Sequence, residues 1–211
     1  MTLTNGATSP KASCHARACS QARAWQDTFG DVAPFVSVNL APRQLYESAL
    51  VTDVNETLFD NGLEPSSLQL ELTERALMGD DAGPLSVLTK LHNTGVRIAL
   101  DDFGTGYWNI LDLRRLPLHE LKLASSFAVG LQSASGLVDQ RIVAALADLA
   151  HALGMTVTAE GIETSAQCGR FRAAGCDTGQ GSLFAPPGPA EQIDHLLGAV
   201  TPLCDVRTEA R

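Results

Sequence analysis

The chain has 211 residues, of which 45% are hydrophobic and 18% charged, a composition typical of a folded protein rather than an intrinsically disordered one. Its formal net charge of −9 argues against a protein held to nucleic acid by bulk positive charge, so we expect no DNA or RNA duplex as a partner. The same charge does not exclude a phosphate-containing ligand, provided that metal ions or a local cationic group offset the repulsion.

Cysteine usage indicates a chain without a disulfide framework. The five cysteines are odd in number and scattered, with no Cys-x-x-Cys pair, which argues against a disulfide scaffold or a zinc ribbon. Cys14 and His15 with Cys19 could form part of a metal site. A helix that carries ordinary small residues is the simpler interpretation, and we favour it.

Neither a targeting signal nor a membrane span is predicted. The first eleven residues lack the apolar core of a signal peptide. The most apolar helical stretch, residues 142–153, is interrupted by Asp148 and His151 and is too short to cross a bilayer. We therefore expect a cytoplasmic protein with no membrane segment in this chain.

Short runs rich in Val, Ile and Leu predict strands. In chain order these runs are Phe35–Leu40, Leu68–Thr73, Val96–Asp102, Glu120–Leu123 and Thr156–Glu160. A weaker pair of short strands is predicted around Gly175–Asp177 and Ser182–Phe184.

Amphipathic stretches between these runs predict helices. Pro42 begins one that runs to about Asn61-Gly62, and Pro84 begins another that ends at Gly95. The two clearest are each closed by a glycine and span Leu137–Leu153 and Ser165–Ala174.

The alternation of strand and helix with short loops predicts parallel strands joined by helical crossovers, and therefore an α/β fold. No linker rich in Pro, Gly or Ser divides the chain. We expect one domain over residues 17–200, a disordered head over residues 1–16 and a C-terminal tail over residues 201–211.

Polar residues fall repeatedly at the ends of the predicted strands. A carboxylate in a strand that is buried on both faces is costly unless it meets a metal or a cation. In a closed parallel barrel the strand ends converge on one face, so these side chains suggest an oxygen-rich site for Mg²⁺ or Mn²⁺. The residues concerned are Asn39, Glu71, Asp101, Asp102, Lys122, Glu160 and Gln180.

Each of these positions also has a purely structural interpretation. Asn39 alone could cap a strand end, Glu71 alone could pair with a buried Arg, and Lys122 alone could lie on a strand surface. Their recurrence at successive strand ends is much harder to explain in that way, and it favours a single site.

Six ordered motifs resemble the EAL family of cyclic di-GMP phosphodiesterases, over about residues 17–197. They are SVNLAPRQL at Ser37–Leu45, LELTE at Leu70–Glu74, IALDDFGTGY at Ile98–Tyr107, LRRLPLHELKL at Leu113–Leu123, TAEGIET at Thr158–Thr164 and GCDTGQGSLFAPP at Gly175–Pro187. The resemblance implies a modified TIM (β/α) barrel that hydrolyses one phosphodiester of cyclic di-GMP to linear pGpG, with two bound Mg²⁺ or Mn²⁺ ions.

The resemblance also implies a role for individual residues. Lys122 matches the lysine near the attacking water, Glu160 the glutamate that binds metal-held water or acts as a base, and Glu74 the glutamate that holds the loop after DDFG. The implied metal ligands are Asn39, Glu71, Asp101, Asp102 and Glu160, and the implied substrate-binding or supporting residues are Glu74, Glu163, Gln180 and Arg43.

Two departures from the family pattern weaken the expected metal site. The Glu-Ala-Leu motif of the family's first strand, with the Arg that follows it, does not occur in the chain, so we expect a barrel that lacks its first strand. The family also carries Asp two residues after its lysine, where this chain has Ala124. Even outer-shell losses at metal sites cost about 10–100-fold in affinity or activity, so we expect impaired catalysis.

A third departure concerns the loop after Asp102, where Tyr107-Trp108-Asn109 replaces small residues. Trp108 could stack on a guanine or cover a homodimer contact through this loop, although a packed structural residue is the simpler interpretation. A barrel that lacks one strand exposes two neighbouring strands, so we also expect the isolated chain to oligomerise, swap elements or be poorly soluble.

Three functional hypotheses follow. The first is a degenerate domain that binds cyclic di-GMP or regulates without efficient hydrolysis. The second is an active phosphodiesterase whose first strand is missing from this sequence, for example because the true start codon lies upstream. The third is a protein-interaction scaffold that binds no nucleotide.

Overall fold

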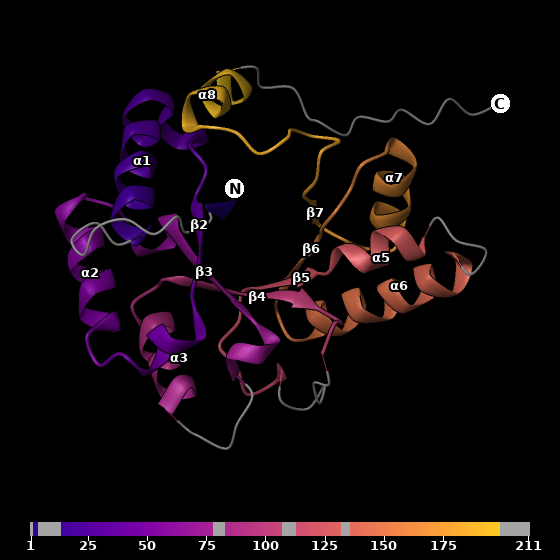
Figure 1. The fold of residues 1–211 in the computed structure, drawn as a ribbon, viewed down its shortest axis with the longest axis horizontal. Helices are drawn as coiled ribbons and strands as arrows, with labels where there is room; N and C mark the ends of the chain where they lie inside the picture. The colour runs from indigo at the N-terminus through magenta and orange to yellow at the C-terminus, as the bar shows by residue number, and fades with distance from the viewer. Residues whose placement is uncertain (1, 4–13, 78–82, 107–112, 132–135, 199–211) are drawn as a thin grey trace. The chain divides into compact units, whose positions relative to one another are not determined.

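Parallel strands and helices alternate along most of the chain in the computed structural model, which describes residues 2–3, 14–77, 83–106, 113–131 and 136–198. The chain divides into two compact units, Met1–His119 and Glu120–Arg211, and each is described by itself. Figure 1 shows the elements of both units in chain order.

The first unit is built on four parallel strands in the order β1-β2-β3-β4. Its strands are β1 (Thr2–Leu3), β2 (Val36–Asn39), β3 (Leu68–Thr73) and β4 (Arg97–Phe103). Its helices are α1 (Cys14–Phe29), α2 (Leu50–Asp60) and α3 (Gly83–Asn93), with 3₁₀ helices at Gly30–Val32, Pro42–Tyr46, Pro65–Ser67 and Glu74–Leu77. Helices α1 and α2 lie side by side, and α1 also contacts β2 (Figure 1).

Strand alternation separates an apolar face from a polar face in this unit. Leu68, Leu70 and Leu72 of β3 are almost fully buried, and they alternate with Gln69, Glu71 and Thr73 on the opposite face. Apolar residues of β2, β4 and the helices join the leucines in the core, among them Val38, Ile98, Leu100, Ala22, Val54 and Leu88.

A row of hydrogen-bonded side chains crosses the polar face near the beginnings of the strands. Ser37, Gln69 and Arg97 occupy paired register positions on β2, β3 and β4. Gln69 Nε2 donates to Ser37 Oγ at 3.2 Å, and Arg97 Nε donates to Gln69 Oε1 at 3.1 Å. The Arg97 guanidinium also lies 4.7 Å from the centre of the Phe35 ring.

The second unit is built on three parallel strands in the order β5-β6-β7. Its elements are β5 (Glu120–Leu123), α5 (Ser125–Gly130), α6 (Gly136–Ala152), β6 (Thr156–Ala159), α7 (Ser165–Ala173), β7 (Thr178–Gly179) and α8 (Ala190–Gly198). Helix α6 contacts β6, α5 and α7 (Figure 1). Its core includes Leu121, Leu123, Val157, Val143, Ala147 and Phe171.

Most predicted elements are confirmed to within one or two residues. The strands predicted at Leu68–Thr73 and Glu120–Leu123 have those bounds, and the α/β class with parallel strands is correct. The structure also shows the two-residue strand β1 beside β2, at an edge where no strand was expected from the sequence.

Two predictions about elements were wrong. The helix expected from Pro42 to Asn61 is divided into a 3₁₀ helix at Pro42–Tyr46 and α2, because Glu47 is extended at φ −80° and ψ 118°. The strands expected around Gly175–Asp177 and Ser182–Phe184 are replaced by β7 and by a turn, in which Phe184 N donates to Gly181 O at 3.1 Å.

Among the described residues, no helix is both long enough and apolar enough to cross a membrane. The expected boundary between head and domain at Ala16 falls inside α1, which begins at Cys14.

Candidate functional site

Strand register brings three of the predicted metal ligands to one face of the first unit. Asn39 at the end of β2 pairs with Glu71 of β3, and Thr73 pairs with Asp101 of β4. Paired residues of adjacent strands point to the same side of a sheet, so Asn39, Glu71 and Asp101 share the polar face near the carboxyl ends of their strands. Glu71 is only 2% exposed.

The chemistry of these donors matches a hard divalent cation, but the described part of the chain does not supply a closed cage. Carboxylate and amide oxygens are the usual ligands of Mg²⁺ and Mn²⁺. Within the described ranges, however, no three His, Cys, Asp or Glu side chains form a group that could hold a metal ion. The donor atoms are therefore of the kind that such an ion prefers. The described residues do not form a complete set of ligands for it.

Asp102 departs from the geometry of the strand that carries it. It has a φ of 55°, in the left-handed region that non-glycine residues rarely adopt, and its side chain is exposed. Strained backbone of this kind clusters at functional sites. The conformation breaks the alternation of β4 at the residue that follows Asp101.

Glu74 contacts the loop after β4. Its side chain is 4% exposed, and Gly104 N donates to its Oε1 at 2.9 Å. A Cβ on Gly106 would overlap Glu74 Oε2, so the loop approaches the carboxylate closely only because residue 106 is glycine. Glu74 therefore links the end of β3 to the segment that follows Asp102.

The second unit contains a buried ion pair between the two residues implied to be catalytic. Lys122 Nζ of β5 lies 2.7 Å from Oε1 of Glu160, which follows β6, and the two side chains are 3% and 14% exposed. Glu160 N also donates to Leu123 O at 3.1 Å. A cation held this close keeps the carboxylate in a fixed position.

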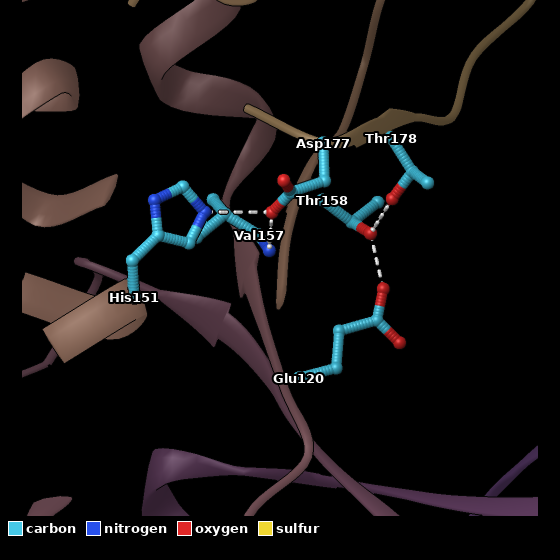
Figure 2. Close-up of polar contacts among 6 residues, drawn as sticks. All are labelled: Glu120, His151, Val157, Thr158, Asp177 and Thr178. Carbon is cyan, nitrogen blue, oxygen red and sulfur yellow. Dashed lines mark hydrogen bonds and ion pairs between the residues drawn. The ribbon is translucent and has the colours of Figure 1, made fainter. Parts of the chain in front are cut away.

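Polar side chains also connect β5, β6 and β7 (Figure 2). The Thr158 hydroxyl donates to Oε1 of the buried Glu120 and also contacts the Thr178 hydroxyl, so one chain of contacts crosses all three strands. Thr158 pairs in register with Lys122 and Thr178, and Glu120 lies two residues before Lys122 on the same strand, so the group supports the strand that carries Lys122.

Asp177 connects α6 to β6 in the same region. Its Oδ2 lies 2.8 Å from His151 Nε2 and accepts a hydrogen bond from Val157 N at 2.7 Å, as Figure 2 shows. Partial burial acts to raise the pKa of Asp177, but the hydrogen bonds from His151 and Val157 outweigh it and hold that pKa below its ordinary value.

The remaining implied site residues lie at the surface. Arg43, in the 3₁₀ helix after β2, is exposed, as are Glu163 and Gln180 of the second unit. The Gln180 backbone joins two segments, because Gln180 N donates to Ala159 O and Gln180 O accepts from Ile162 N. Ala124 is 2% exposed, so its methyl group is buried directly after β5. Trp108 and the rest of residues 107–112, with the proposed homodimer contact, lie outside the described residues.

One buried side chain that contacts this region was missed by the sequence analysis. Gln167 of α7 accepts hydrogen bonds from the backbone amides of Glu163 and Thr164. Thr164 in turn accepts from Gln167 N, which completes a capping box. The Thr-x-x-Gln spacing before an amphipathic stretch is the signal that could have identified it.

Comparisons with known proteins agree with the motifs. The family model of the EAL domain matches residues 14–187. The chain is 42% identical over 176 residues to the bifunctional diguanylate cyclase/cyclic di-GMP phosphodiesterase MucR of Pseudomonas aeruginosa, which is 83% of this chain and 25% of the relative. The chain thus spans about a quarter of the length of that curated relative.

Solved structures show the same likeness in three dimensions. The cyclic di-GMP complex of the MucR phosphodiesterase has a TM-score of 0.78 and 41% identity, covering 85% of this chain and 71% of that chain. A complex of Klebsiella pneumoniae BlrP1 with manganese and cyclic di-GMP has a TM-score of 0.69 and 26% identity, covering 79% and 41%.

Proposed function

Because the chain belongs to the EAL domain family and has its α/β barrel-type fold, we propose that it binds cyclic di-GMP and hydrolyses it weakly or not at all. The observation that carries this proposal is the shared polar face of β2, β3 and β4, where Asn39, Glu71 and Asp101 stand together.

The residues proposed to hold divalent ions are those of the family pattern that the chain retains. They are Asn39, Glu71, Asp101, Asp102 and Glu160. When bound, such ions lower the pKa of a water and stabilise the negative charge that develops on phosphate. The acidic ligands attract the ions, and for this reason the net charge of −9 does not conflict with an anionic substrate.

Lys122 and Glu160 supply the remaining chemistry in the proposal. The Lys122 ammonium holds one oxygen of the Glu160 carboxylate at 2.7 Å, so this carboxylate is oriented to accept a proton from a water molecule. Glu74 keeps the loop after Asp102 in place. Glu163, Gln180 and Arg43 are exposed and could contact the nucleotide or its surroundings.

Two features favour weak catalysis over efficient hydrolysis. Ala124 offers no oxygen to a metal, and neither residue of β1 is acidic, so this strand does not replace the missing glutamate. A full phosphodiesterase remains the alternative if the strand with Glu-Ala-Leu is supplied by residues outside this sequence. A scaffold without nucleotide binding is the third hypothesis.

Paired assays distinguish the three hypotheses. We expect calorimetry in Ca²⁺ to detect binding of cyclic di-GMP, and we expect the Glu71→Gln substitution to weaken that binding. In Mn²⁺, chromatography of the reaction products should detect little pGpG. Turnover at an ordinary rate would support the active phosphodiesterase instead. Absence of binding in either metal would contradict the proposal and leave the scaffold.

Restoring the family aspartate tests the cause of the weak catalysis. We expect Ala124→Asp to raise residual pGpG formation about tenfold or more, since lost support at metal sites costs about that much. Ser126→Asp is a matched control, because it adds the same charge to the exposed first turn of α5. Equal rates for the two variants would show that Ala124 is not the limiting defect.

A further inference from the structure

Gln167 lies where three segments of the second unit meet. It belongs to α7 and is 4% exposed, although glutamine is mostly found at protein surfaces. A buried side-chain amide has to satisfy two donors and an acceptor, so its partners reveal which segments it holds together.

The carbonyl oxygen of Gln167 holds the loop after β6. Its Oε1 accepts from Glu163 N at 2.8 Å and from Thr164 N at 2.9 Å. Two backbone amides on one oxygen fix the direction of the peptide planes that follow Glu160. This loop is therefore attached to α7 by more than the ordinary cap of a helix.

The amino group of Gln167 points to a different element. Its Nε2 donates to Ala128 O at 3.1 Å in a buried contact with α5, 39 residues away in sequence. Helix α5 begins two residues after β5, the strand that carries Lys122. One amide thus joins the helix that follows the Lys122 strand to the loop that follows Glu160.

A second contact joins the same two segments. Gly161 has a φ of 69°, and a Cβ there would lie 2.6 Å from the Ser125 Cβ, so the loop packs directly on the first residue of α5. Gly161 sets how closely the segments approach, while Gln167 sets their orientation through hydrogen bonds.

From this geometry we propose that Gln167 is a positioning residue, which holds the Glu160 carboxylate against the Lys122 ammonium by joining the loop after β6 to α5. The inference rests on the proposed function, because it gives these two residues their catalytic role. It predicts that loss of the amide loosens the ion pair even where the fold persists.

Three variants separate positioning from general stability. Gln167→Met keeps the length and volume of the side chain and removes all its hydrogen bonds. Gln167→Glu keeps the oxygen that holds the loop and replaces the donor that faces Ala128 O. Phe171→Leu is the control, because Phe171 is a fully buried residue of the same helix, and the substitution makes a core side chain smaller while Gln167 keeps its hydrogen bonds to the loop.

Lysine acylation in the metal-free protein measures the ion pair directly. Lys122 is buried against Glu160, whereas Lys90 on α3 is exposed. The labelling rate of Lys122 divided by that of Lys90, measured by peptide mass spectrometry in one sample, therefore rises as Lys122 becomes less protected. We expect Gln167→Met to raise this ratio about tenfold, since loss of buried hydrogen bonds favours local opening by about that factor. Gln167→Glu should raise it less, and Phe171→Leu should leave it unchanged.

Two results would overturn the inference. One is a Gln167→Met ratio equal to that of the wild type, and the other is an equal rise in Phe171→Leu at a matched free energy of unfolding. Calorimetry of cyclic di-GMP in Ca²⁺ is the second readout, and Gln167→Met should bind several-fold more weakly than Phe171→Leu. If the wild type binds no nucleotide, the proposed function fails, and the labelling ratios still decide whether Gln167 positions the pair.

Discussion

At the scale of one residue, the backbone conformation of Asp102 lowers the stability of the fold at a position of the candidate site. It is the only non-glycine residue with a positive φ among those described, and the left-handed region costs an L-residue about 1–2 kcal/mol. Asp and Asn tolerate this region better than most side chains, which explains how the position keeps a carboxylate. The side chain proposed to bind metal is thus held in a backbone conformation that glycine adopts more easily.

Substitution at residue 102 tests this effect on stability. We expect Asp102→Gly to raise the free energy of unfolding by about 0.5–1 kcal/mol and Asp102→Ala to lower it, because only glycine relieves the strain. Both variants should weaken the Mn²⁺ dependence of cyclic di-GMP binding to the same extent. Urea unfolding followed by circular dichroism measures the first effect, and equal stabilities for the two variants would argue against strain at this position.

The sequence predicts which polar residues share a face of the sheet better than it predicts long-range side-chain contacts. Asn39, Glu71 and Asp101 could be placed on one face because strand alternation and register are local rules. The contact between Gln167 and Ala128 could not, since it joins residues 39 positions apart and depends on how helices pack. Long-range side-chain contacts carry no periodic signal in a single sequence.

At the scale of elements, buried strands were predicted well because apolar runs and turn residues bound them sharply. The helix expected from Pro42 was wrong for a specific reason. Leu45, Leu50, Val54 and Leu58 are all buried at nearly helical spacing, so the apolar pattern continues across the extended residue Glu47. Periodicity alone cannot distinguish one helix from two helices that bury the same face.

Two glycines of the second unit should respond in opposite directions to the same substitution. Gly169 lies inside α7 with open space around its Cβ position, so Gly169→Ala should raise the free energy of unfolding by about 0.5–1 kcal/mol. A Cβ on Gly181 would overlap the backbone of Ile162, so Gly181→Ala should destabilise the protein by about 1–3 kcal/mol. Urea unfolding of both variants in parallel checks the signs, and a neutral Gly181→Ala would contradict the close packing of this turn.

At the scale of the whole molecule, acid should destabilise the protein in two separate steps. Burial lowers the pKa of His15, despite the nearby charges of Asp53 and Glu47, and the hydrogen bonds from His151 and Val157 lower the pKa of Asp177 despite its own burial. In both cases the unfolded chain binds more protons than the folded protein, so stability rises with pH.

The two steps fall in different pH windows. The contribution of His15 is fully present above pH 6.5 and is lost as the pH falls below that value, and the contribution of Asp177 is present above pH 3.8 and is lost below it. We expect His15→Leu to reduce the slope of the stability curve between about pH 7 and 5 without removing it, because burial also lowers the pKa of His119. Asp177→Asn should flatten only the acid limb, by less than about 1 kcal/mol because this pair is partly exposed. Urea midpoints across pH measure both, and a wild-type slope retained in His15→Leu would exclude His15 as the cause.

The row formed by Ser37, Gln69 and Arg97 has a consequence for how this protein can evolve. Its hydrogen bonds fix the alignment of β2, β3 and β4, and a slip of one residue would break them and turn every polar side chain toward the helices. Asn39 and Glu71 lie two residues further along β2 and β3, so they are aligned by these hydrogen bonds and do not themselves have to hold the strands in place. Mutations can therefore replace side chains of the row with Asn39 and Glu71 one at a time while the alignment of the strands persists, so this row is free to change faster than the row that holds the strands in place.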